Sequence, residues 1–84
     1  MVKVNFSGEL RNVTKKEFVR RNGEKGADCK ILVECGVYSH TLPCTEKVVE
    51  KFESGALVKG STYEFDAVYQ PRFQFNNFVV QDVR

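Results

Sequence analysis

Three cysteines and a single histidine are the side chains of this 84-residue sequence best suited to hold a metal or act in catalysis. Cys29 and Cys35 precede His40 and Cys44, with five, four and three residues between successive members. Structural zinc sites usually contain a closely spaced ligand pair, which this pattern lacks. The segment also alternates as a core-facing strand does, with small apolar residues on one parity: Cys29, Ile31, Val33, Cys35 and Val37. The pattern favours reduced core thiols over zinc, and we expect no cofactor.

The signatures of catalysis are otherwise missing from the sequence. Cys44 could act as a nucleophile with His40 as its base, but no third residue is placed to orient such a pair. There are no paired carboxylates at a useful spacing and no glycine-rich loop of the phosphate-cradling type. We therefore expect a binding protein rather than an enzyme.

Positive charge is concentrated in one segment. The formal net charge of the chain is only +2, yet residues 11–30 hold seven basic and three acidic residues, a net of +4. Four of the basic residues surround Asn22-Gly23, which is a strong signal for a hairpin with a type I′ turn: Lys16, Arg20, Arg21 and Lys25. Polyanion binding depends on local cation density, so these four residues are predicted to bind phosphates. The alternative is a solvated hairpin that protects an edge strand from aggregation.

Aromatic residues gather in a second segment. Five of the ten Phe and Tyr residues lie between Tyr63 and Phe75. The predicted binding residues here are Tyr69, Arg72, Phe73 and Phe75. An exposed ring on which a base stacks contributes about 1–3 kcal/mol to binding, and we expect Phe73 to be exposed. Tyr38 and Phe18 are further stacking candidates, each with a structural role as the alternative.

The periodicity predicts short strands and one helix. Alternation of apolar and polar residues marks the first strand, with a bend expected at Gly8. Pro43 ends a later strand, and Thr45 is the expected N-cap of a helix with an apolar face. The predicted elements are strands over 2–10, 13–21, 25–35, 37–42, 63–70 and 78–83, a helix over 46–54, and a hairpin connection over 70–77 in which Pro71 ends regular pairing.

Length and composition limit the class of protein. A chain this short forms one domain, spanning 1–84, and most of its apolar residues must pack in the core. It contains no run of about 18 apolar residues and no apolar centre of a secretion signal near its N-terminus. We expect no membrane partner, and unpaired thiols agree with a cytoplasmic location.

The order of elements is the one expected of an OB-fold, an all-β five-stranded Greek-key barrel with a helix between the third and fourth strands. The basic hairpin would protrude between the first two barrel strands. The segments VRRNGEKGADCKILVEC (19–35) and FQFNNFVV (73–80) resemble the small single-stranded-DNA-binding proteins of bacteriophages, in particular the helix-destabilising protein of filamentous phages. The helix over 46–54 departs from the filamentous-phage pattern and is closer to larger single-strand binders.

The resemblance implies a protein that coats single-stranded DNA, with little sequence preference, during phage or mobile-element replication or recombination. A homodimer is expected because one small barrel offers a short site, and linking two sites raises affinity. Replication or recombination proteins are further expected partners, and RNA could satisfy the same phosphate and stacking groups. The alternative is a small β-barrel adaptor that binds another protein through the same hairpin and aromatic segment.

Overall fold

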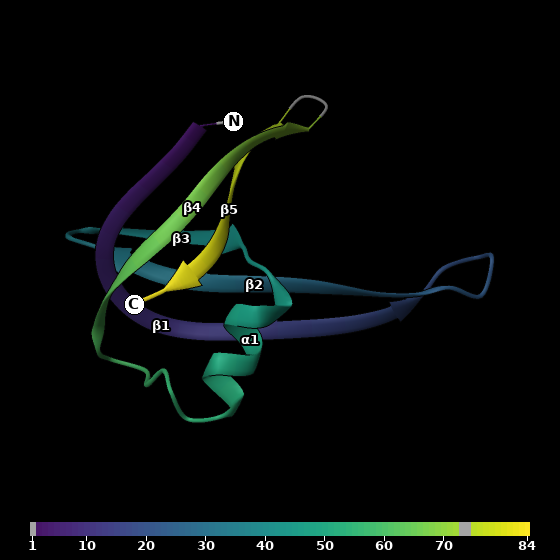
Figure 1. The fold of residues 1–84 in the computed structure, drawn as a ribbon, viewed down its shortest axis with the longest axis horizontal. Coiled ribbons are helices and arrows are strands. Elements are labelled where there is room, and N and C mark those ends of the chain that lie inside the picture. The colour runs from purple at the N-terminus through teal and green to yellow at the C-terminus, as the bar shows by residue number, and fades with distance from the viewer. Residues whose placement is uncertain (1, 73–74) are drawn as a thin grey trace.

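The computed structural model describes residues 2–72 and 75–84, and the side chains among them outside 70–77. These residues form five strands and one helix (Figure 1). In chain order they are β1 (Val2–Val19), β2 (Lys25–Cys35), β3 (Tyr38–Pro43), α1 (Glu46–Glu53), β4 (Thr62–Arg72) and β5 (Phe75–Val83). The predicted order of strands and helix is confirmed.

The two predicted strands over 2–10 and 13–21 are one continuous strand, β1. Its first half pairs with β4, from Val2 to Glu9, and its second half pairs with β2, from Glu9 to Val19. A bulge between Leu10 and Asn12 joins the two halves without breaking the strand. Such a bulge bends a strand and shifts its alternation by one residue, which is why the sequence suggested two elements.

The strands form one antiparallel sheet in the order β3-β2-β1-β4-β5, which curls so that its two edge strands meet. The closure is a short parallel bridge between Cys44 and Val80. The Cys44 N–H donates to the Cys29 carbonyl at 3.0 Å, and the Thr45 N–H donates to the Val80 carbonyl at 3.1 Å. A five-stranded barrel with its helix after the third strand is an OB-fold-like barrel, so the predicted fold class is confirmed.

The core lies inside this barrel and beneath α1. Side chains from four strands and the helix are fully buried there: Leu10, Ile31, Val33, Val48, Phe65 and Val80. Gly8 lets β1 cross the end of β2 closely, because a Cβ at this position would lie 2.6 Å from Cγ1 of Val33. The bend predicted at Gly8 is thus a point of close packing.

The start of α1 differs from the prediction. Thr45 has the extended backbone of an N-cap, but its hydroxyl makes no capping hydrogen bond. The Thr45 Oγ1 instead donates to the carbonyl of Gln81 at 3.3 Å, which ties the helix start to β5. The helix ends at Glu53, one residue before the predicted end, and Gly55 follows it with a φ of 86°.

The predicted connection over 70–77 is wrong for most of its length. β4 continues to Arg72 and β5 begins at Phe75, with Pro71 opposite Asn76. Among the described residues, pairing of β4 with β1 reaches Tyr69 and no further, so Pro71 pairs with β5 alone. Proline is tolerated at such an edge because its missing N–H can face the open side.

Candidate nucleic-acid interface

The ends of β1 and β2 project from the barrel as a two-stranded ribbon, which we call the wing (residues 14–28; Figure 1). Every residue from Thr14 to Lys25 is exposed, whereas Val13 and Cys29 are buried. From Lys15 to Val19 the strand advances about 13 Å at ~3.3 Å per residue, before the turn begins. The predicted protruding hairpin is therefore confirmed.

The turn at the tip of the wing is not the predicted type I′ turn. The Gly23 N–H donates to the Arg20 carbonyl at 2.9 Å, which makes Arg21 and Asn22 the central residues. Gly23 follows them with a φ of 86°, the arrangement of a type I turn with a left-handed glycine. The Asn22 Oδ1 accepts the Glu24 N–H at 3.0 Å and holds the turn. Arg21 consequently lies at the corner of the wing.

The basic residues of segment 11–30 divide into two groups by their ion pairs. Three of the seven basic residues of segment 11–30 have a carboxylate partner: Arg11 with Glu9 and Glu34, Lys15 with Glu17, and Lys30 with Asp28. Among the side chains that the structure describes, the other four make no ion pair: Lys16, Arg20, Arg21 and Lys25. These four are the cations predicted from the sequence. The structure places Arg20, Arg21 and Lys25 at the tip, and Lys16 opposite Asp28 nearer the barrel.

Phe18 supplies an aromatic ring on the same face of the wing as Lys16 and Arg20. It is 41% exposed, and it lies over Gly26 of the facing strand, where a Cβ would come within 2.6 Å of its ring. The Arg20 guanidinium lies 5.8 Å from the centroid of this ring, within cation–π range. Phe18, named only as a further candidate from the sequence, thus has the geometry of a base-stacking platform beside phosphate-binding cations.

The same face of the sheet continues from the wing onto the barrel. There β1, β2 and β3 enclose a shallow hollow of about 180 Å³, lined by Asn12, Thr14, Lys30, Leu32 and Thr41. We call this surface, together with Lys16, Phe18 and Arg20, the outer face. The five residues that line this hollow were not among the binding residues predicted from the sequence. The alternation of β2, which leaves Lys30 and Leu32 on the parity opposite to Ile31, was the signal that could have found them.

The second predicted cluster lies at another part of the barrel. Tyr69 is half-buried, and its ring packs against Phe78 of β5 with centroids 5.2 Å apart. The backbones of Arg72 and Phe75 are paired at the end of the β4–β5 hairpin, but their side chains and the whole of Phe73 lie outside the described residues. In Figure 1 the end of this hairpin lies at the top of the view, apart from the tip of the wing at the right. The structure therefore does not gather the two clusters at one point.

Tyr38 lies at the β2–β3 turn, at the opposite end of β2 from the wing (Figure 1). Its side chain is 69% exposed, and Val37 beside it is 90% exposed. The nearest charged groups along these strands are Glu34 and its partner Arg11. The structure separates Tyr38 from the unpaired cations of the wing, and its role in binding stays a prediction.

The cysteines and His40 are not brought together as metal ligands. Cys29 and Cys44 are buried and His40 is exposed, and within residues 2–72 and 75–84 no group of three potential ligands is found. Burial raises the pKa of the Cys29 thiol. Burial, and to a smaller extent the neighbouring Cys29, raise the pKa of the Cys44 thiol to about 12. Both thiols are therefore protonated at neutral pH and poor nucleophiles.

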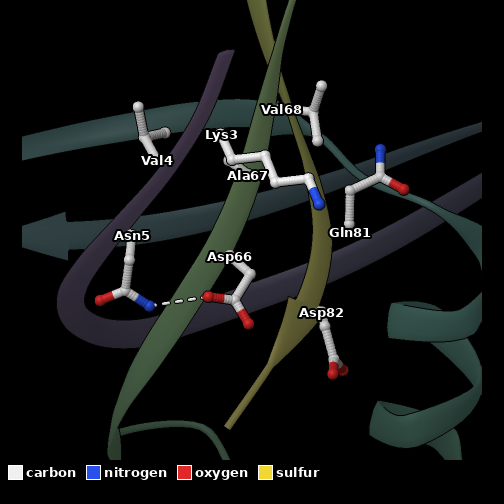
Figure 2. A pocket seen from close by; sticks show the side chains of 8 residues that line it. All are labelled: Lys3, Val4, Asn5, Asp66, Ala67, Val68, Gln81 and Asp82. Atoms are coloured by element: carbon white, nitrogen blue, oxygen red, sulfur yellow. Dashed lines mark hydrogen bonds between the residues drawn. The ribbon is translucent and has the colours of Figure 1, made fainter. Parts of the chain in front are cut away.

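A larger hollow, of about 550 Å³, lies elsewhere on the outside of the barrel, across β1, β4 and β5 (Figure 2). Asp66 accepts hydrogen bonds from Asn5 at 2.7 Å and from Arg84 at 2.8 Å, and both bonds hold its pKa below the usual range. Lys51 donates to Asp82 at 2.6 Å and likewise lowers the pKa of that carboxyl. Both carboxylates of this hollow are thus paired with cations, and the lining also includes Lys3.

No helix in the described part of the chain is both long and apolar enough to cross a membrane.

Comparisons with known proteins returned one structural likeness. No protein-family model matches the sequence, and a search of curated proteins returned no match. The chain is similar in structure to a mitochondrial single-stranded DNA binding protein from S. cerevisiae, Rim1, with a TM-score of 0.49. The two chains are 15% identical, and the match covers 99% of this chain and 92% of the other. At this level the likeness carries no argument about what this chain binds.

Proposed function

We propose that this protein binds single-stranded DNA, with little sequence preference, along the outer face. The observation that supports the proposal is the projecting wing itself, where Arg20 lies over the exposed Phe18 ring. Among the described side chains, four wing cations have no carboxylate partner: Lys16, Arg20, Arg21 and Lys25. Binding of a single strand without readout of its sequence needs cations that follow the phosphates and ring faces that stack on the bases. Strands 2 and 3 and the loop between strands 1 and 2 are also the surfaces with which OB-folds bind oligonucleotides.

The named residues have separate roles in this proposal. Lys16, Arg20, Arg21 and Lys25 neutralise phosphates, and Phe18 stacks on a base near the tip of the wing. Tyr69, Arg72, Phe73 and Phe75 extend the path at the β4–β5 hairpin, and Tyr38 extends it at the far end of β2. The biological setting we propose is coating of single strands during phage or mobile-element replication or recombination, in the bacterial or infected-host cytoplasm.

A homodimer completes the proposal, because two linked barrels would double a short binding site. Its support is the edge of β1 from Val2 to Gly8, which pairs with β4 on one side and faces no strand on the other in the described sheet. Sedimentation equilibrium would report a mass near twice that of the chain, and a monomer at all concentrations would exclude the dimer.

The deciding experiment is an anisotropy titration of a labelled oligo-dT, and of a duplex of equal length, at two salt concentrations. We expect tighter binding to the single strand than to a blunt duplex, and weaker binding at the higher salt concentration. Absence of binding to oligo-dT at low salt would exclude the proposal. Replacing Arg20 and Arg21 by glutamate separates it from the protein-adaptor alternative, which predicts loss of a protein partner with no effect on DNA.

A further inference from the structure

The wing carries cations on both of its faces and at its tip. Lys16 and Arg20 belong to the outer face together with Phe18. Lys25 lies opposite Val19 on the other face, which continues inward to the buried Cys29. Arg21 lies at the corner between the two. A ribbon with cations on both faces and at its end matches a site with phosphates on two sides.

The groove of a DNA duplex is such a site. The major groove of B-DNA is about 12 Å wide and admits a two-stranded β-ribbon, with a phosphate backbone along each wall. The two strands of the wing are about 4.8 Å apart. Gly26 opposite Phe18 and the tight turn at Gly23 keep the ribbon narrow near its end. The projection of about 13 Å before the turn reaches beyond the barrel, which would otherwise meet the duplex first.

The outer face leads directly onto this ribbon. The hollow on β1, β2 and β3, the Phe18 ring and the tip follow one another along the same strands. A single strand that lies along the outer face would therefore arrive at the tip of the wing, where a duplex could begin. Because one rigid ribbon connects the two contacts, binding to both at once gains the advantage of an intramolecular second contact.

We propose that the wing inserts into the major groove of duplex DNA, so that the protein recognises the junction between single- and double-stranded DNA. This inference rests on the proposed binding of single strands along the outer face. Arg21 and Lys25 are the residues that would contact the two phosphate walls.

The test compares three DNA probes of matched length by anisotropy at one salt concentration: a single strand, a blunt duplex, and a duplex with a single-stranded tail. Wild-type protein is expected to bind the tailed duplex at least tenfold tighter than either of the other two. In the variant Arg21→Ala with Lys25→Ala, the ratio of affinities for tailed duplex and single strand should fall to about one. The control Lys3→Ala with Lys59→Ala removes the same charge from exposed sites off the wing and should keep the wild-type ratio.

The outcomes separate this inference from the proposed function. Tight binding to the single strand with no preference for the tailed duplex would overturn the inference and leave the proposed function standing. No binding to any probe would overturn both. Equal binding to blunt and tailed duplexes would overturn recognition of the junction. A tailed A-form RNA duplex has a deep, narrow major groove, so an equal preference for it would overturn insertion into that groove.

Discussion

The salt dependence of binding gives a quantitative test of the wing. Each phosphate neutralised on a single strand contributes about −0.7 to the slope of log affinity against log salt concentration. Four wing cations have no carboxylate partner among the described side chains, which predicts a slope of about −2.8, a loss of affinity of about 50-fold between 50 and 200 mM salt. Arg11, Lys15 and Lys30 are left out of this number because each already has a carboxylate partner.

The perturbation is the double replacement of Arg20 and Arg21 by alanine. It leaves Lys16 and Lys25, so the slope should fall to about −1.4 and the loss over the same salt range to about sevenfold. Both replaced side chains are exposed, so the circular dichroism spectrum and thermal midpoint should stay close to wild type.

The assay is anisotropy of a labelled oligo-dT titrated at five or more salt concentrations. The matched control is Lys3→Ala with Lys59→Ala, which changes the net charge equally and should keep the wild-type slope. An unchanged slope in the wing variant, or an equal fall in the control, would refute the reasoning, since the affinity would then depend on total charge rather than on the wing.

Three further results are expected. Phe18→Ala should weaken binding about 5- to 150-fold, as loss of ~1–3 kcal/mol of stacking requires, while Val19→Ala on the other face of the same strand should have little effect on single-strand affinity in the same titration. Gly8→Ala should lower the free energy of unfolding in urea by about 1–3 kcal/mol, because the added Cβ overlaps side chains of β2; an unchanged midpoint would contradict the packing at this position. Asp82→Asn should remove the ion pair with Lys51. Because the pKa of Asp82 is lowered in the folded protein, its ionised carboxylate stabilises the fold above about pH 4, and this contribution is lost as the pH falls through the lowered pKa. The free energies of unfolding of wild type and variant should therefore differ at pH 7 and converge in acid.

The strand order and the protruding hairpin could be predicted from the sequence because each depends on local signals. Alternation marks the strands, Asn22-Gly23 marks a tight turn, and the charges around it rule out burial. The exact turn could not be predicted, because Asn-Gly fits both a type I′ turn and a type I turn followed by a left-handed glycine. The choice depends on the register of β1 and β2, which the barrel determines.

The predictions from the sequence were wrong or incomplete where the structure depends on contacts between residues distant in the sequence. The bulge at Arg11 merges two predicted strands into β1, because this strand must pair with β4 and then with β2. Pro71 remains in β4 because, in the described sheet, it pairs with β5 alone and needs no N–H toward β1. The hollow of the outer face was missed for the same reason: its residues come from three strands whose pairing no local pattern specifies.

The continuity of β1 also explains how a small barrel can hold a long wing in a fixed direction. Leu10 and Val13 are buried in the core, and six residues later the same strand reaches Val19 at the tip, paired with β2 throughout. A flexible loop with the same cations would lose conformational entropy on binding, whereas the two strands of this ribbon are already paired with each other. The exposed residues of the wing contribute little to the core, so binding there can be changed without unfolding the barrel. The modest net charge of +2 is consistent with this arrangement, because the cations act where the ribbon places them.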